Sequence, residues 1–519
     1  MKKSPLTSVL GAFVLLALAA ALTFAIQAGG QTRPPEYNEI VAAQKIADPA
    51  ARLKEFERLK AAYPQSAMMG TIDGNIYGIK LEMAETLETV LQLQRGDLGK
   101  GEGFMKWMSY FGAATDLVDH DKLEKFDKAG VLKAVQAYKA EGDKLLSDPS
   151  LIQSLPEAQR PYALDYAKRF HVTLAMAQLN AGQAAAAASS LEAYKAAGGA
   201  SDSAYHFALA EASARLNKKA EALEGYLNAA VENHADATDK AKAAWIALKG
   251  SEEGFAAALE AKQKELPYHP AAFQAPAEWK GKTVLAEIFT GSECPPCVGA
   301  DLGFDGLIES VPSKYLAILE YHLPIPRPDP IMNPATGARQ AFYGVRSTPS
   351  TFFDGEAKYG GGGGRGNAEN KYKQYLGEIM SRLGQAPVLT LKAEAVLSGD
   401  KVEVKAIVDK PAPGAEIHIA LVQGEVPYKG SNGILFHKMV VRDIRTVAPE
   451  SPKAVFDLSA SEQATDAYLT EFEKTYTRVP NFKWAERHFK ISRNGLKVVV
   501  FAQDSQTKKV LNAVTVGVR

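Results

Sequence analysis

The fold is decided by the stretch VLAEIFTGSECPPC, which runs from Val284 to Cys297. Its first half is a short apolar run interrupted only by Glu287, a pattern typical of a buried β-strand. Its second half holds two cysteines separated by two prolines, and these are the only two cysteines in 519 residues. A Cys-x-x-Cys disulfide closes a very small loop and therefore stabilises a fold little. The pair is better explained by chemistry than by stability.

The spacing of Cys294 and Cys297 indicates a redox pair at the start of a helix. Backbone N–H groups and the helix dipole there would stabilise Cys294 as an exposed thiolate, while Cys297, one turn further, lies within bonding reach. Proline is tolerated in the first turn of a helix, so the two intervening prolines suit this geometry. We therefore expect Cys294 to attack a substrate disulfide and Cys297 to resolve the mixed disulfide.

A Cys-x-x-Cys motif can also be half of a zinc site, but zinc normally takes four ligands and the chain has no second Cys pair. His322 and His437 show no ligand spacing, and His322 is more simply the cap of a strand. We therefore expect neither a bound metal nor an organic cofactor. A copper carrier that uses the two thiolates as soft ligands stays an alternative.

Two further features fit a redox site. A carboxylate at Glu287, buried inside the strand, would have a raised pKa and would relay a proton to or from Cys297; the alternative is a strand-edge glutamate that faces water. A cis peptide bond at Pro349 would turn the backbone of Thr348 toward the Cys pair and offer an edge to a substrate peptide. The alternative is an ordinary trans proline at the start of a strand.

The elements around the motif alternate between strands and helices. After the strand at 283–289 and the Cys motif, periodicity predicts a helix at 298–310, a strand at 315–321, a helix at 335–343, a strand at 350–353 and a closing helix at 370–383. This is a β-α-β-α-β order with a terminal helix. A run of five glycines from Gly360 predicts a flexible loop.

This order of strand, Cys-Pro-Pro-Cys, strand, helix, Thr348-Pro349 and strand resembles the thioredoxin superfamily. The stretch 284–294 particularly resembles bacterial secreted thioredoxin-like proteins of the cell envelope, and the resemblance covers residues 279–383. It implies that Cys294 is the nucleophile, that Cys297 resolves, that Glu287 assists protonation and that Pro349 is cis.

The chain departs from the thioredoxin pattern in three places. One extra residue separates Glu287 from Cys294, Glu293 stands where a tryptophan would precede the motif, and residues 323–334 form a Pro-rich insertion. These departures leave open the direction of electron flow and the substrate.

The remaining sequence predicts an exported protein with a domain on either side. Lys2 and Lys3 precede a run without charge from Val9 to Ala28, so residues 1–30 are predicted to be a cleaved signal peptide or a retained single membrane anchor. The body of the chain would then lie in the cell envelope, periplasmic or secreted. Sixty basic residues balance sixty acidic ones, which disfavours nucleic acid as a partner.

Residues 37–267 are rich in Ala, Leu, Glu and Lys and are predicted to be helical. The stretches 174–182 and 209–217 echo each other at a spacing of about 34 residues, which resembles tetratricopeptide repeats. The repeats would offer a concave surface to a protein partner; the alternative is an Ala-rich bundle. Residues 387–519 alternate with a period of two, which predicts a β-sandwich. Within them, 428–443 resembles a segment that follows secreted thioredoxin-like domains, and we assign it no catalytic role.

The sequence thus predicts a multidomain α, α/β and β chain: a helical tetratricopeptide-like domain at 37–267, a thioredoxin-like domain at 275–385 and a β-sandwich at 387–519. We expect an exported thiol–disulfide oxidoreductase that acts on protein thiols or disulfides and exchanges electrons with a thiol-based donor. The alternatives are a non-catalytic envelope protein that recruits partners through its helical repeats, and the copper carrier.

Overall fold

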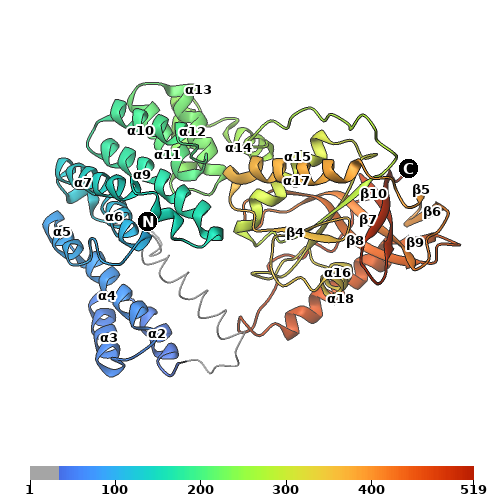
Figure 1. The fold of residues 1–519 in the computed structure, drawn as a ribbon, viewed down its shortest axis with the longest axis horizontal. Coiled ribbons are helices and arrows are strands. Elements are labelled where there is room, and N and C mark those ends of the chain that lie inside the picture. The colour runs from blue at the N-terminus through green and yellow to red at the C-terminus, as the bar shows by residue number, and fades with distance from the viewer. Residues whose placement is uncertain (1–33) are drawn as a thin grey trace. The chain divides into compact units, whose positions relative to one another are not determined.

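The computed structural model describes residues 34–519. The predicted signal peptide or anchor at residues 1–30 lies outside the described residues. Among the residues that are described, no helix is both long and apolar enough to cross a bilayer. The chain divides into two compact units, one that ends at Tyr226 and one from Leu227 to Arg519, and Figure 1 shows their elements.

The first unit is built from helices, as its composition predicted. Helices α3, α5, α7 and α11 start at a side chain that accepts hydrogen bonds from backbone N–H groups of the first turn; Asp127, for example, accepts from the N–H groups of Ala129 and Gly130. The helices are α2 (Tyr37–Gln44), α3 (Pro49–Ala62), α4 (Met69–Met83), α5 (Leu87–Arg95), α6 (Phe104–Val118), α7 (Lys128–Leu146), α8 (Ser150–Gln153), α9 (Arg160–Asn180), α10 (Ala184–Ala196), α11 (Ser203–Arg215) and α12 (Lys219–Val231), which crosses into the second unit.

The two echoing stretches fall in α9 and at the end of α11. Helix α10 packs against both α9 and α11, around a core that includes Leu191 and Tyr194. Small residues let α11 and α12 approach closely, since a Cβ on Gly225 would lie 2.9 Å from the Cβ of Ala210. Stacked pairs of this kind are expected of both tetratricopeptide repeats and a plain bundle, so the repeat assignment stays a prediction.

The second unit is organised around an eight-stranded mixed sheet in the order β11-β10-β7-β8-β2-β1-β3-β4. Strand β2 is parallel to both β1 and β8, and the other neighbours are antiparallel. A second sheet holds β5-β6-β9. The strands are β1 (Val284–Thr290), β2 (Leu316–His322), β3 (Ser350–Phe353), β4 (Glu356–Gly360), β5 (Thr390–Ser398), β6 (Lys401–Asp409), β7 (Ala415–Pro427), β8 (Phe436–Val447), β9 (Lys453–Asp457), β10 (Leu496–Asp504) and β11 (Val510–Gly517).

The predicted order around the Cys motif is present. The order is β1, α15 (Val298–Ser310), β2, α16 (Pro334–Tyr343), β3 and α17 (Ala368–Leu383), with β4 as an added strand. All seven residues of β1 are buried, as the apolar run predicted. The core around them includes Phe289, Phe304 and Tyr375. Two further helices, α13 (Ala237–Lys249) and α14 (Phe255–Lys264), precede this region.

The C-terminal strands divide between the two sheets. Strands β7, β8, β10 and β11 extend the sheet that contains β1, and β5, β6 and β9 form the small one. The two sheets bury a common core in which Ile419 and Val500 of the large sheet meet Val404 and Phe456 of the small one. The predicted fold class is confirmed: a helical region, a mixed α/β sheet and a packed antiparallel sheet. Sequence analysis missed helix α18 (Leu458–Thr475), although Asp457 caps its start.

Candidate functional site

The two cysteines are joined at the start of α15. Strand β1 ends at Thr290, and a short loop leads to Cys294, whose Sγ is bonded to that of Cys297. The N–H of Cys297 donates to the carbonyl oxygen of Cys294 at 3.0 Å, so the second cysteine closes the first turn. The pair thus lies at the positive end of the dipole of α15, which is the environment that favours a thiolate.

Both cysteines are buried, whereas the prolines between them are exposed. Neither Cys294 nor Cys297 has measurable exposure in this disulfide-bonded form. The exposed thiolate at Cys294 stays a prediction for the reduced pair. The covering groups come from segments far away in sequence, which is why the motif alone did not reveal them.

Thr348 is one of the covering groups. The Thr348–Pro349 peptide bond is cis, as the resemblance to the thioredoxin superfamily implied. The Oγ1 of Thr348 lies 3.4 Å from the Sγ of Cys294, and its carbonyl oxygen lies 3.9 Å from the same sulfur. The hydroxyl also donates to the carbonyl of Ile325 at 2.8 Å, which fixes its position. The structure therefore brings Thr348 and Cys294 together; that this edge binds a substrate stays a prediction.

The glycine run lies against the first turn of α15. The N–H of Gly299, in the first turn of α15, donates to the carbonyl oxygen of Gly363 at 2.8 Å. A Cβ on Gly299 would lie 2.4 Å from the carbonyl oxygen of Gly362, and a Cβ on Gly362 would lie 2.4 Å from that of Pro296. Only residues without a side chain permit this approach of two backbones. The run is thus packed on the helix that carries the cysteines.

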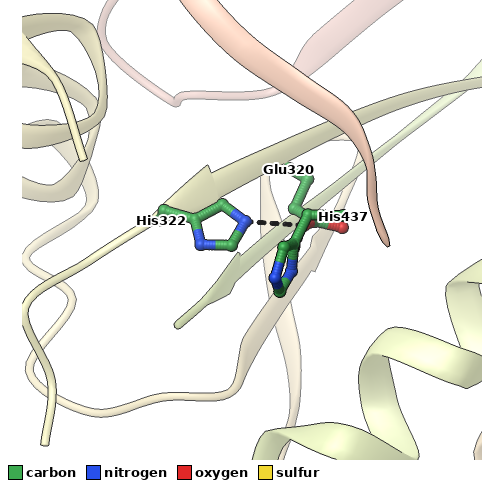
Figure 2. A group of neighbouring side chains, drawn as sticks. All are labelled: Glu320, His322 and His437. Atoms are coloured by element: carbon green, nitrogen blue, oxygen red, sulfur yellow. Dashed lines mark hydrogen bonds and ion pairs between the residues drawn. The ribbon is translucent and has the colours of Figure 1, made fainter. Parts of the chain in front are cut away.

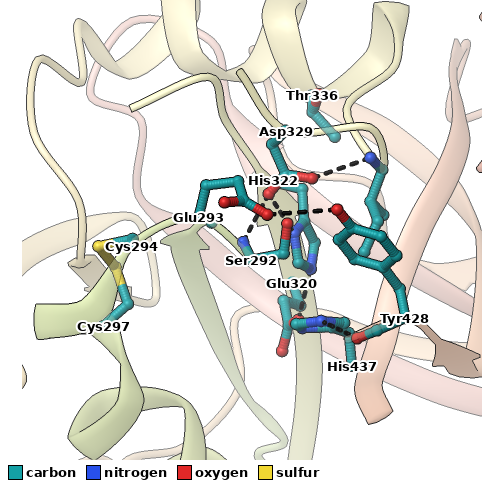
Figure 3. Close-up of polar contacts among 12 residues, drawn as sticks. Ser292, Glu293, Cys294, Cys297, Glu320, His322, Asp329, Thr336, Tyr428 and His437 are labelled. Atoms are coloured by element: carbon teal, nitrogen blue, oxygen red, sulfur yellow. Dashed lines mark hydrogen bonds and ion pairs between the residues drawn. A yellow bond between two sulfur atoms is a disulfide. The ribbon is translucent and has the colours of Figure 1, made fainter. Parts of the chain in front are cut away.

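The loop between β7 and β8 closes over the residues before Cys294. The N–H of Asn432 donates to the carbonyl of Ser292 at 3.1 Å. The hydroxyl of Tyr428 donates to the carboxylate of Glu293 at 3.2 Å (Figure 3). A Cβ on Gly430 would lie 2.1 Å from the carbonyl oxygen of Ser292. This loop lies within 428–443, the segment to which no catalytic role was assigned from the sequence. Its glycines were the signal of a close backbone contact.

Glu287 is buried, which excludes the water-facing alternative for this residue. Its carboxylate pairs with the guanidinium of Arg339 through two contacts, at 2.8 and 3.0 Å. The hydroxyls of Tyr343 and Tyr321 donate to it at 2.6 and 3.0 Å. Burial and the charge of Glu287 raise the pKa of both tyrosines, so they stay protonated donors. All four contacts come from β2 and α16, and the relay to Cys297 stays a prediction.

A second buried polar cluster lies behind the Cys loop. Glu320 and His322, both on β2, lie beside His437 of β8 (Figure 2). His322 Nε2 is 2.8 Å from Glu320 Oε1, and His437 Nδ1 is 3.9 Å from the same oxygen. Asp329 contacts His322 Nδ1 at 2.9 Å and accepts the N–H of Ser292 at 2.6 Å. Asp329 therefore links this cluster to the loop that precedes the cysteines.

The two histidines of the cluster differ in charge. Burial opposes a charge on His322, but the carboxylates of Asp329 and Glu320 outweigh it and raise its pKa to about 10. Burial and the neighbouring His322 lower the pKa of His437 to about 3, so His437 is neutral. Sequence analysis missed this group because pairing between β2 and β8, and not sequence spacing, brings the histidines together.

The fold and the site thus place a Cys-x-x-Cys disulfide between strand β1 of a mixed sheet and the helix α15 that follows it. No family model matches the chain, and no curated protein matches it. Among solved structures, HBP35 of Porphyromonas gingivalis is similar over 47% of this chain and 77% of that chain, at 13% sequence identity and a TM-score of 0.32.

Proposed function

We propose that the chain is an exported thiol–disulfide oxidoreductase whose redox centre is Cys294 and Cys297. The observation that carries the proposal is the disulfide between these residues at the start of α15, with Thr348 against the Sγ of Cys294. The chain has no other cysteine, and a loop this small makes a poor structural staple. Proteins place a reversible pair at a helix start because the N–H groups there stabilise the thiolate.

The proposed exchange starts from the reduced pair. The Cys294 thiolate attacks a substrate disulfide, one S–S bond breaks, and one substrate sulfur leaves as a thiolate that takes up a proton. Cys297 then gives up its proton and attacks the Sγ of Cys294, which releases the second substrate thiol. The substrate gains two electrons and two protons, and the Cys pair becomes the disulfide. A dithiol donor outside the chain restores the reduced pair.

Burial of the pair adds a condition to this exchange. A thiolate must approach along the S–S axis, so a covering segment has to move before Cys294 can react. We therefore expect a small phosphine to reduce the disulfide faster than a folded protein dithiol does, measured by quenching with a thiol-alkylating reagent and mass spectrometry. Equal rates for the two reductants would contradict this condition.

The proposed activity is tested by reduction of insulin disulfides with the full-length protein. We expect Cys294→Ser to reduce the rate to that of buffer and Cys297→Ser to accumulate a mixed disulfide with the substrate, because the resolving thiol is gone. Cys297→Ser is the matched control, since it removes the same disulfide but keeps the nucleophile. Activity retained in Cys294→Ser would overturn the assigned nucleophile. Full complementation of a deletion strain by the double variant Cys294→Ser/Cys297→Ser would instead favour a binding role.

We also propose that the body of the chain acts outside the cytoplasm, with the helical unit as the surface for a protein partner. The uncharged run after Lys3 supports export. A reporter enzyme that folds only outside the cytoplasm, fused after residue 33, is expected to be active. Loss of export when residues 1–30 are deleted would agree with this, and unchanged export would contradict it.

A further inference from the structure

The second buried cluster has the chemistry of a metal site, and it goes beyond the redox function proposed for the cysteines. Glu320, His322 and His437 each offer one ligand atom, and these atoms all lie within 4.8 Å of one another. All three residues are less than 5% exposed. Two imidazoles with one carboxylate form a donor set that Zn²⁺ accepts in proteins.

Each imidazole uses one ring nitrogen for a contact outside the cluster, and its other nitrogen faces Glu320. The Nε2 of His437 lies 3.2 Å from the backbone carbonyl of Tyr428, which can only accept, so this nitrogen carries the proton and Nδ1 has the lone pair. The carboxylate of Asp329 likewise holds the proton on Nδ1 of His322. In a metal site, the second nitrogen of a ligand histidine makes this kind of contact with a carboxylate or carbonyl.

Without a cation, the inner geometry leaves an acceptor facing an acceptor. The Nδ1 lone pair of His437 stands 3.9 Å from the carboxylate oxygen of Glu320, with no proton to share. In a tetrahedral zinc site, bonds of about 2.0–2.2 Å place the ligand atoms about 3.4 Å apart. The 2.8 Å of His322 to Glu320 and the 3.9 Å of His437 to Glu320 lie on either side of that separation.

Further buried carboxylates surround the three residues. Asp329 is fully buried beside the ligands, and Asp301 and Asp305 of α15 lie in the field of Glu320. The ammonium of Lys438 reaches Asp305 at 3.4 Å. Buried carboxylates are stable when a cation or a proton compensates them.

We propose that Glu320, His322 and His437 bind a divalent transition-metal ion such as Zn²⁺, which takes the place of the proton between His322 Nε2 and Glu320 and releases it to solvent. The three ligand residues are buried. Strands β2 and β8 are joined by a single registered pair, Glu320 with Val440, and the ion ties these two strands together. Through Asp329 it also fixes the loop before Cys294.

The proposal is tested by giving Zn²⁺ to the full-length oxidised protein after removal of metals with a chelator. We expect one ion per chain in competition with a chromogenic chelator, and the same stoichiometry in the double variant Cys294→Ser/Cys297→Ser. Asp329→Asn is expected to weaken binding by about 10–100-fold, as loss of an outer contact does, and His437→Ala by more. His418→Gln, which changes another buried histidine of the same sheet, is the control and should bind as the wild type does.

X-ray absorption of the zinc-loaded wild type gives a readout that does not depend on the folding of any variant. We expect nitrogen and oxygen ligands with imidazole scattering and no sulfur. Sulfur ligands, or binding that survives His437→Ala, would overturn the site. No uptake of Zn²⁺ by the folded wild type would also overturn it, because His322 would then be a protonated bridge between Glu320 and Asp329. Failure of the insulin assay leaves each of these results intact, since the Cys pair takes no part in them.

Discussion

Glu287 and Glu320 are buried on neighbouring strands of one sheet, yet their surroundings differ. The parallel register of β1 and β2 pairs Ile288 with Glu320, so the two carboxylates point to opposite faces. Glu287 meets the permanent positive charge of Arg339 on one face. Glu320 meets two imidazoles on the other. A buried carboxylate needs a counter-charge: Arg339 supplies it for Glu287, and a proton on His322 or a metal ion supplies it for Glu320.

Removal of the permanent cation beside Glu287 is expected to have the largest effect. Arg339→Met leaves the Glu287 carboxylate buried without its partner, so we expect the second unit to lose about 3–5 kcal/mol of unfolding free energy. Urea denaturation followed by tryptophan fluorescence measures the loss. The control is Arg339→Met combined with Glu287→Leu, which removes both charges and should recover part of the stability. A single variant as stable as the wild type would contradict the assignment of this pair.

A further buried carboxylate, Asp116 of α6, differs from both because its described polar contact is with a neutral hydroxyl, that of Tyr77 at 3.4 Å. Burial raises its pKa to about 7. Asp116 loses its proton near pH 4 in the unfolded chain but only near pH 7 in the folded chain. The free energy of unfolding of the first unit therefore falls as pH rises from about 4 to 7 and stays constant above that range.

Asp116→Asn should therefore stabilise the first unit by about 2–4 kcal/mol at neutral pH and by little near pH 4, at 1.36 kcal/mol per unit of pKa. Thermal unfolding at the two pH values measures both effects. An equal gain at both would show that the ionisation of Asp116 is not the cause. A destabilised variant at neutral pH would show that the carboxylate has an undetected counter-charge.

The comparison predicts that only the Glu320 face responds to metal. Zn²⁺ at about 100 times its dissociation constant should stabilise the wild type by about 2.7 kcal/mol. Glu320→Gln should abolish this gain, because an amide oxygen is a poorer ligand, and Tyr321→Phe on the opposite face should keep it. Chemical denaturation with and without Zn²⁺ checks both variants. A gain that persists in Glu320→Gln would place the ion elsewhere.

How much of the site the sequence reveals depends on how local its contacts are. Cys294, Cys297 and the Thr348-Pro349 pair are local motifs whose chemistry follows from neighbouring residues, and the structure places them together. The apolar run around Glu287 likewise predicted its burial. Its partner Arg339 was not predicted, because the packing of α16 on the sheet sets that contact.

The sequence pattern did not predict the segments that pack around the cysteines, or the cluster of Glu320, His322 and His437. His437 meets His322 only because β8 pairs with β2, and the predicted domain division placed these strands on different domains. The glycine run predicts a flexible loop, but the absence of side chains is also what allows the run to pack closely against Gly299. A local pattern therefore fixes what a segment can do, and the long-range pairing decides what it does.

The smallest expected effect tests how far Glu287 depends on each donor. Tyr343→Phe removes one hydroxyl and leaves the guanidinium of Arg339 and the hydroxyl of Tyr321, so we expect a loss of about 1.5 kcal/mol, the low end for a hydrogen bond to a charged group. Insulin reduction should be unchanged if the hydroxyl only stabilises the carboxylate. Slower insulin reduction with wild-type stability would instead make Tyr343 part of a proton path from Glu287, because a structural contact changes stability first. Tyr359→Phe, which removes a hydroxyl that contacts Glu378 in the same unit, is the matched control and should leave the rate unchanged.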